Sequence, residues 1–108
     1  MSRVDPDFKQ RVNELVAKIP KGRLMTYGQI AAICGAPWAA WEVGQLAHFG
    51  PSELPWQRVV NKKGGLASGY PGGFTAQKKQ LESDGVAVSD DFLVDIDNLL
   101  WQPSKTTL

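Results

Sequence analysis

A short Gly-Ala-Pro turn at residues 35–37 joins two segments with helical patterns, and it constrains the possible folds of this sequence more than any other feature. The first segment starts at Thr26, which forms the pattern of a capping box with Gln29 three positions later. The second segment runs from about residue 38 to about residue 49 and follows a proline, a residue suited to the start of a helix. Two helices joined by so tight a turn predict a helix-turn-helix.

Two further helices are predicted from apolar spacing and from residues that start or stop a helix. Asp5 is expected to cap the first one, with Pro6 in its first turn. Its apolar stripe continues to Ile19 at helical spacing. The other is expected over residues 75–84, with Gly85 as its stop.

The remaining residues predict a small β element beside this helical body. Residues 58–60 have the composition of a strand, residues 61–65 that of a turn, and residues 66–67 could form a short returning strand. Residues 68–73 form a glycine-rich loop. The predicted fold class is therefore mainly α with a small β wing.

The size and composition of the chain are those of one globular domain. Its 108 residues suffice for a single core, so we expect one domain over residues 1–108, with residues 104–108 frayed. Hydrophobic residues make up 43% of the chain, yet no apolar run approaches the roughly 20 residues that span a bilayer. The first ten residues lack the apolar segment of a signal peptide. We expect a monomer without membrane contact, in the cytoplasm (in the nucleoid, or in the nucleus if eukaryotic).

Single copies of cysteine and histidine limit the chemistry of the chain. One cysteine, Cys34, excludes an internal disulfide and a cysteine-based zinc cluster. With His48 as the only histidine, neither a metal site nor a cofactor is expected. The net charge of +1 does not by itself indicate a nucleic-acid partner. Any contact with DNA must therefore be local and depend on shape.

Several short motifs, taken in order and spacing, resemble the O6-alkylguanine-DNA alkyltransferase family over nearly the whole chain. Pro-Trp-Gln-Arg-Val at residues 55–59 is similar to the family signature Pro-Cys-His-Arg-Val. The other matching pieces are residues 19–22, 26–31 and 35–37, Val43-Gly44, Gly64, Leu81, Gly85-Val86, and residues 101–103. The resemblance implies a winged helix-turn-helix DNA-binding domain that enters the minor groove and rotates a damaged nucleotide out of the duplex.

Trp56 stands where the family has its reactive cysteine, as in the alkyltransferase-like branch. Gln57 replaces the histidine that activates this cysteine, and an amide is no base at neutral pH. We therefore expect no catalytic residue and no enzyme activity. Cys34 is interpreted as a core residue, although alkyl transfer through it is a minor alternative. Tyr27 matches the tyrosine that crowds the 3′ phosphate and promotes nucleotide rotation.

Trp56 has two possible roles. A flipped base needs an apolar or aromatic wall and a few polar edges. Trp56 could supply the wall, and backbone groups near Gly69 and Tyr70 could supply the edges. The residues alone favour the other interpretation, that Trp56 fills the core. Arg58 is interpreted as a structural residue that ties the wing to the helix at about residues 38–49, the third along the chain, through backbone carbonyls, in preference to a DNA contact.

The helix at about residues 38–49 has an outer face that could contact DNA. At about 100° per residue this face carries small residues, one large aromatic residue and polar groups: Ala40, Trp41, Gly44, Gln45 and His48. Trp41 could be a wedge that fills the gap left by a flipped base, or it could pack beneath the C-terminal segment. The wedge has a cost, because an exposed tryptophan gives up about 1.5–3 kcal/mol of burial free energy. Both interpretations stay open.

Three departures from the family pattern bear on DNA binding. Trp41 occupies the position of the family's intercalating arginine, and Glu42 places a negative charge beside it. Repulsion between Glu42 and a nearby phosphate is on the order of 1 kcal/mol. The loop at residues 68–73 lacks the arginine that alkyltransferase-like relatives often use to read the lesion. The lesion pocket is therefore expected to combine features of the alkyltransferases with features of the alkyltransferase-like proteins.

These features support one main hypothesis and one alternative. In the main hypothesis the protein recognises O6-alkylguanine in duplex DNA by minor-groove binding and nucleotide flipping, and hands the lesion to nucleotide excision repair proteins. In the alternative it is a DNA-independent helix-turn-helix scaffold that binds a protein partner through an exposed Trp41. The residues expected to bind DNA and the lesion are Tyr27, Ala40, Trp41, Gly44, Gln45, Trp56, Arg58, Gly69 and Tyr70.

Overall fold

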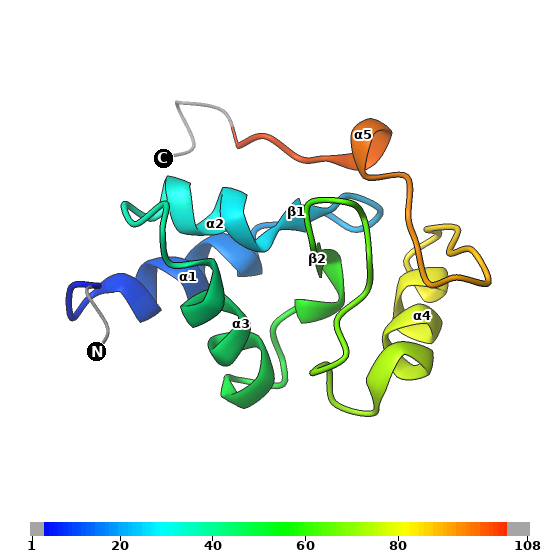
Figure 1. Cartoon of the computed structure of the whole chain (residues 1–108), viewed down its shortest axis with the longest axis horizontal. Helices are drawn as coiled ribbons and strands as arrows, with labels where there is room; N and C mark the ends of the chain where they lie inside the picture. Colours follow the sequence, from blue (N-terminus) through cyan, green and yellow to red (C-terminus); the bar gives the residue numbers. More distant parts are fainter. Residues whose placement is uncertain (1–3, 104–108) are drawn as a thin grey trace.

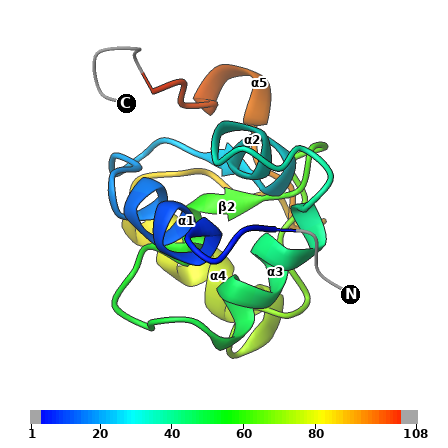
Figure 2. The same cartoon turned by 90° about the vertical axis from the view of Figure 1, so that its left-hand side faces the viewer.

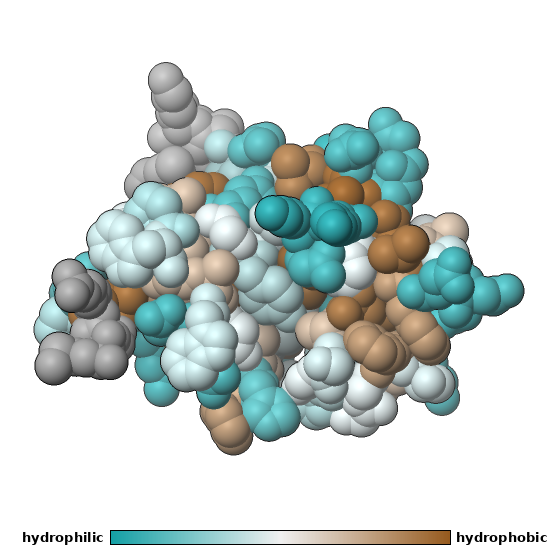
Figure 3. Space-filling model, in the orientation of Figure 1, coloured by the Kyte–Doolittle hydropathy of each residue, from teal (hydrophilic) through white to brown (hydrophobic). Residues whose placement is uncertain are grey.

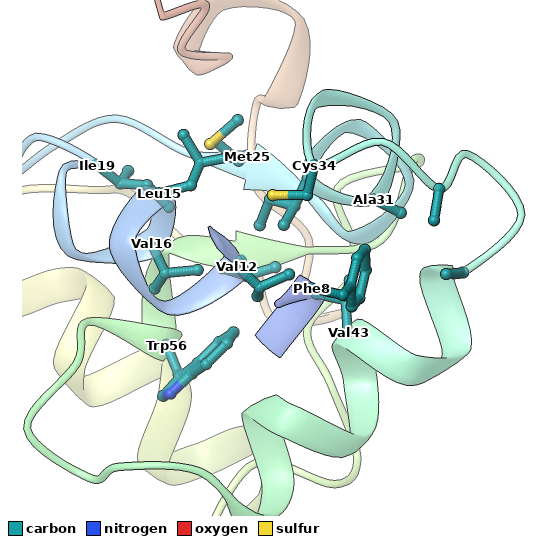
Figure 4. Close-up of a cluster of buried hydrophobic side chains, with 14 residues drawn as sticks. Phe8, Val12, Leu15, Val16, Ile19, Met25, Ala31, Cys34, Val43 and Trp56 are labelled. Atoms are coloured by element: carbon teal, nitrogen blue, oxygen red, sulfur yellow. The ribbon is translucent and has the colours of Figure 1, made fainter. Parts of the chain in front are cut away.

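Three helices enclose the main apolar core in the computed structural model, which describes residues 4–103. They are α1 (Phe8–Ala17), α2 (Tyr27–Ile33) and α3 (Ala40–Phe49), with α2 above α1 and α3 below it in both views (Figures 1 and 2). The predicted apolar stripe of the first helix lies in this core. The buried members of the core are Phe8, Val12, Leu15, Val16, Ile19, Met25, Ile30, Ala31, Cys34, Ala36, Ala39, Val43, Trp56 and Val59 (Figure 4).

Two short strands connect this helical half to the rest of the chain. β1 (Met25–Thr26) lies parallel to β2 (Val59–Val60), with Met25 opposite Val59 and Thr26 opposite Val60. A one-turn 3-10 helix, η1 (Trp56–Arg58), leads directly into β2. The elements that follow β2 are thereby held beside the start of α2.

The predicted hairpin wing is wrong in its second strand. Residues 61–65 do turn, because Asn61 N–H donates to the Gly65 carbonyl. Leu66 does not pair back onto β2; its N–H donates to the Phe92 carbonyl instead. The strand partner of β2 is β1, which lies much earlier in the chain, so the small sheet joins two parts of the domain and is no hairpin.

A second, smaller core lies beyond β2. It is covered by α4 (Gly73–Ser83), on the side of β2 away from α1, and by α5 (Ile96–Leu99) (Figure 1). The sequence predicted a helix close to α4 and none at α5. The buried residues of this core are Leu24, Val60, Leu66, Leu81, Val86, Val94 and Ile96. No helix in the described part of the chain has the length and apolar character needed to cross a membrane.

The predicted capping box at the start of α2 is confirmed. The Thr26 side chain accepts a hydrogen bond from the Gln29 backbone N–H at 3.1 Å, and the Gln29 side chain accepts one from the Thr26 backbone N–H at 3.2 Å. Gln29 Nε2 also donates to the Trp101 carbonyl at 2.6 Å. The residues after α2 and α4, Gly35 and Gly85, have φ of 95° and 86°, as expected for glycines that end helices.

Two predicted helix starts need correction. α1 begins at Phe8 with Asp7 as its cap residue, because the Asp5 carboxylate accepts from the Asp7 N–H and pairs with Arg11. α3 begins at Ala40, since the turn after α2 continues through Trp38. Both errors fall within the two residues over which helix ends are poorly defined by sequence. The predicted fraying of residues 104–108 lies outside the described residues.

A buried glutamine holds the loop after β2 in place. Gln77 on α4 is fully buried, and its Oε1 accepts from the Ala67 N–H at 2.8 Å. Its Nε2 donates to the carbonyls of Gln57 and Val59, each at 3.2 Å. One amide thus joins α4 to the strand on one side and to the loop on the other. The burial of Gln77 was not predicted, because a single polar residue on a helix is usually exposed.

Replacing Gln77 with leucine should lower the free energy of unfolding by about 2–4 kcal/mol, because the backbone groups that it satisfies become buried without partners. Urea unfolding of Gln77→Leu against the wild type measures this change. Gln80→Leu on the exposed face of the same helix is the matched control and should change the value by no more than about 0.5 kcal/mol. Equal effects of the two substitutions would contradict the structural role of Gln77.

Candidate nucleic-acid interface

An open cavity of about 730 Å³ lies between the start of α2, the outer face of α3 and the loop that follows β2. Its walls come from residues that are distant in sequence and that the β1–β2 pair brings together. The lining residues are Tyr27, Gly28, Ala40, Trp41, Gly44, Gln45, Ala47, His48, Asn61, Lys62 and residues 65–70. On the face seen in Figure 3, strongly apolar residues gather over α4, α5 and the segment between them.

Seven of the nine residues predicted to bind DNA and the lesion line this cavity. They are Tyr27, Ala40, Trp41, Gly44, Gln45, Gly69 and Tyr70. Trp41 is 71% exposed, so the interpretation that it packs beneath the C-terminal segment is wrong. Gly44 has no atom within 4 Å of the position that a Cβ would occupy, so the helix surface beside Trp41 is open to a close approach.

Tyr27 lies at the first position of α2, where the capping box fixes the backbone. Burial raises the pKa of Tyr27 to about 12. The phenol therefore stays neutral at physiological pH, and it can lie near a phosphate without charge repulsion. Tyr70 on the opposite wall behaves similarly, because burial and the nearby Asp84 carboxylate raise its pKa.

A contact between α3 and the loop closes one end of the cavity. His48 Nδ1 lies 2.5 Å from the Gly69 carbonyl oxygen, so this ring nitrogen carries the proton and donates. His48 also packs edge-on against Phe49, with 4.3 Å between ring centroids. His48 was expected on the outer face of the helix, without a specific role. Its loop partner is distant in sequence, and no local pattern indicates the pair.

Lys62 is the only lysine or arginine among the described residues that line the cavity. It lies in the turn after β2, whereas Glu42 on α3 does not line this cavity and lies instead on the side of the helix near α1. Lys62 was expected in a turn and was not predicted as a binding residue. Two consecutive lysines in a tight turn form an exposed positive charge, and this pattern could have indicated a phosphate contact.

Trp56 fills the core and also reaches a cavity. It is 4% exposed and belongs to the main core, so the core-filling interpretation is confirmed (Figure 4). The same side chain lines a second, smaller cavity of about 150 Å³. An apolar cavity of that size in another protein holds a benzene ring. Its lining residues are Ala47, His48, Gly50, Ser52, Leu54, Trp56, Tyr70 and Pro71, of which Ala47, His48 and Tyr70 also line the larger cavity.

Arg58 lines neither of these two cavities, and its side chain bonds within the fold, so a contact with DNA stays a prediction. Its Nε and Nη2 donate to the Asp84 carboxylate at 2.9 and 3.1 Å, and its Nη1 donates to the Ile19 carbonyl at 2.8 Å. The predicted structural role is confirmed, but its partners were wrong. Arg58 ties η1 to the ends of α4 and α1, not to α3.

Cys34 lies in the core at 4% exposure. Burial raises the pKa of its thiol, against a smaller opposing effect of Arg11. The thiol therefore stays protonated at neutral pH and is a poor nucleophile. Among residues 4–103, no group of three or more histidine, cysteine, aspartate or glutamate side chains is placed to hold a metal ion.

Comparisons with known proteins agree with this geometry. A family model described as the DNA-binding domain of 6-O-methylguanine DNA methyltransferase matches residues 7–86. A DNA base-flipping protein of Escherichia coli is 38% identical over 99 residues, covering 90% of this chain and 76% of that protein. Alkyltransferase-like protein 1 of Schizosaccharomyces pombe is 33% identical over 104 residues, covering 90% of this chain and 96% of that protein.

The structure of the S. pombe protein has been determined in complex with DNA. The crystal structure of S. pombe Atl1 in complex with damaged DNA containing O6-carboxymethylguanine superposes with a TM-score of 0.83 at 31% identity. The match covers 93% of this chain and 99% of that one. The fold and the cavity define a small helical DNA-binding domain. The chain belongs to the 6-O-methylguanine DNA methyltransferase family and, within it, to the alkyltransferase-like proteins.

The Arg58–Asp84 pair makes stability depend on pH. Burial alone would raise the pKa of Asp84, but hydrogen bonds from Arg58 and Gln57 outweigh it, so the pKa in the folded protein lies below the usual value. A lowered pKa contributes stability above the unfolded-state pKa of about 3.9, and this contribution is lost as the pH falls through the folded-state value. Asp84→Asn should therefore be less stable than the wild type at neutral pH and should lose less stability in acid.

Chemical unfolding at a series of pH values between about 2 and 7 measures this difference. Asp91→Asn, at an exposed carboxylate, is the control and should follow the wild-type curve. If the wild type and Asp84→Asn lose the same unfolding free energy as the pH falls, the pair does not stabilise the fold.

Proposed function

We propose that this protein recognises O6-alkylguanine in duplex DNA and leaves the alkyl group in place. The observation that carries the proposal is the position of Trp56. An indole occupies the site of the family's reactive cysteine, and its edge lines a cavity with room for an aromatic ring. The side chain can therefore form part of a pocket for a modified base, and it has no thiolate to accept an alkyl group.

The proposed binding mode uses the large cavity and the exposed face of α3. Ala40 and Gly44 allow the helix to approach the minor groove closely, and Trp41 occupies the gap left by the rotated nucleotide. Tyr27 would crowd a phosphate beside the lesion as a neutral phenol. The damaged base would then enter the cavity between Gln45 and Tyr70, with its substituent directed to Trp56.

The chemistry of the neighbouring groups supports binding without transfer. Gln57, in place of the activating histidine, donates from Nε2 to the Asp84 carboxylate at 3.3 Å. It is an amide in a structural hydrogen bond and cannot take a proton from a nucleophile. Cys34 is buried and protonated. Neither residue is placed to accept an alkyl group from a base in the cavity.

Release of the lesion to nucleotide excision repair proteins, with the protein acting as a cytoplasmic or nuclear monomer, remains part of this proposal. Its support is the chemistry: a protein that binds a lesion and does not repair it needs a second activity to remove the damage.

The alternative of a DNA-independent protein scaffold also has an observation in its favour. Trp38 is 62% exposed and Trp41 is 71% exposed, and two exposed tryptophans near one helix start could contact a protein. Salt dependence separates the two functions. Phosphate contacts make affinity fall steeply as the salt concentration rises, and an apolar protein contact does not.

The direct test of the proposed function is a titration of the protein with a duplex containing one O6-methylguanine and with its undamaged twin, at several salt concentrations. We expect tighter binding to the damaged duplex and weaker binding to both at high salt. Equal affinity for the two duplexes would contradict the proposed recognition of the lesion.

Replacing Trp41 with arginine should tighten binding to the lesion duplex by about two- to tenfold, because it adds a positive charge on the exposed helix face that the proposal places against the phosphates. The same titration measures the change, and the dependence of log affinity on log salt should steepen by about one contact. Trp38→Arg adds the same charge outside the cavity lining and should have a smaller effect. If the two variants bind equally, position 41 does not lie at the DNA surface.

A further inference from the structure

The Trp56 indole nitrogen is buried, and no described protein atom accepts a hydrogen bond from it. Buried polar groups in folded proteins nearly always have a partner, and a donor without one destabilises the fold. In residues 4–103 the only other buried side-chain atom of this kind is Asn13 Oδ1, on α1. Trp56 therefore combines a flat surface that packs in the core with a donor that nothing in the protein satisfies.

The N–H edge of the indole faces the side of the smaller cavity. In Figure 4 the nitrogen lies at the end of the side chain turned away from Val12. Cζ2, which lies on the same edge as the nitrogen, is 3.8 Å from the position that a Cβ on Gly50 would take. Gly50, Ser52 and Leu54 form one wall of this cavity. The donor thus points toward the segment at residues 50–54 that borders the cavity.

This segment borders the indole edge, and its backbone hydrogen bonds are all local, although the Leu54 side chain packs against the main core. The Gly50 N–H donates to the Leu46 carbonyl at 2.6 Å, the Leu54 N–H donates to the Pro51 carbonyl at 3.4 Å, and the Trp56 backbone N–H donates to the Leu54 carbonyl at 2.8 Å. A small displacement of residues 50–54 would open a path from the cavity to the N–H without breaking the pairing of β1 with β2. A ligand atom that satisfies the donor would favour this displacement, because the closed arrangement leaves the donor unpaired.

We propose that the Trp56 N–H selects O6-alkylguanines whose substituent carries a hydrogen-bond acceptor a few bonds from the base. The inference rests on the proposed function. Ala47, Leu54 and Pro71 give the cavity apolar walls that suit the hydrocarbon part of a substituent. An ether, hydroxyl or carboxylate oxygen in such surroundings is disfavoured unless it is bonded, so its acceptance depends on the indole donor.

Two adducts of nearly the same shape test the proposal. O6-(2-methoxyethyl)guanine and O6-butylguanine differ in one position, where an ether oxygen replaces a methylene group. In duplexes of one sequence, we expect the wild type to prefer the ether adduct by about three- to tenfold. Trp56→Phe keeps an aromatic ring and removes the donor, and it should lose or reverse this preference. Trp38→Phe removes an exposed indole instead and should retain it.

A second readout follows the donor itself. In a ¹⁵N-labelled protein the Trp56 indole N–H signal, assigned by its loss in Trp56→Phe, should move downfield with the ether adduct and not with the butyl adduct. This measurement needs no variant in the complex, so it decides the question even if Trp56→Phe folds poorly.

The outcomes separate the inference from the function on which it rests. Equal wild-type affinity for the two adducts, or a preference that survives in Trp56→Phe, overturns the donor role and leaves lesion recognition intact. An indole signal that moves equally with both adducts also overturns it. If neither adduct duplex binds more tightly than the undamaged one, the proposed function fails together with the inference.

Discussion

The parallel pairing of β1 with β2 is the constraint on which the candidate site depends. Tyr27 follows β1 directly, Trp56 starts the turn that leads into β2, and Lys62 lies just beyond β2. Four residues in register, Met25 opposite Val59 and Thr26 opposite Val60, thus place a tyrosine, a tryptophan and a lysine from distant parts of the sequence around adjoining cavities. The pair is buried, apart from the partly exposed Thr26, so the site is built on the core and not on a loose surface loop.

Two side chains, Arg58 and Gln77, hold the segments on either side of β2 in place. Arg58 joins η1 to Asp84 and Ile19, and Gln77 joins β2 to the loop that carries Gly69 and Tyr70. Trp56 lies between these two anchors. Its position in the core gives the pocket a rigid wall, and rigid placement favours recognition because little conformational freedom remains to be lost on binding. An indole at this position has no thiolate, which is the nucleophile that the family signature otherwise supplies.

The sequence predicted the features that depend on neighbouring residues. The capping box of Thr26 and Gln29, the helix stops at Gly35 and Gly85, and the apolar stripe of α1 are local patterns with a physical cause. The outer face of α3 followed from helical periodicity, and seven predicted site residues meet at one cavity.

Apart from two helix starts and the short α5, the errors concern pairings between distant segments. No local pattern indicates that β2 pairs with β1, or that Leu66 bonds to Phe92, so a hairpin was expected. The partners of Arg58 and the burial of Gln77 were missed for the same reason. Trp56 shows most clearly what the sequence does not determine. A core residue and a cavity wall were treated as alternatives, but the same indole lies in the core and lines a cavity.

Central to the proposed function is that a modified guanine is held beside Trp56 without losing its alkyl group. Intact-mass measurement of both partners, after long incubation of the protein with an O6-methylguanine duplex under conditions where the complex forms, tests it most directly. We predict that the masses of protein and DNA stay unchanged. A protein that gains one methyl group, on Cys34 or on any other residue, while the DNA loses it would contradict the account.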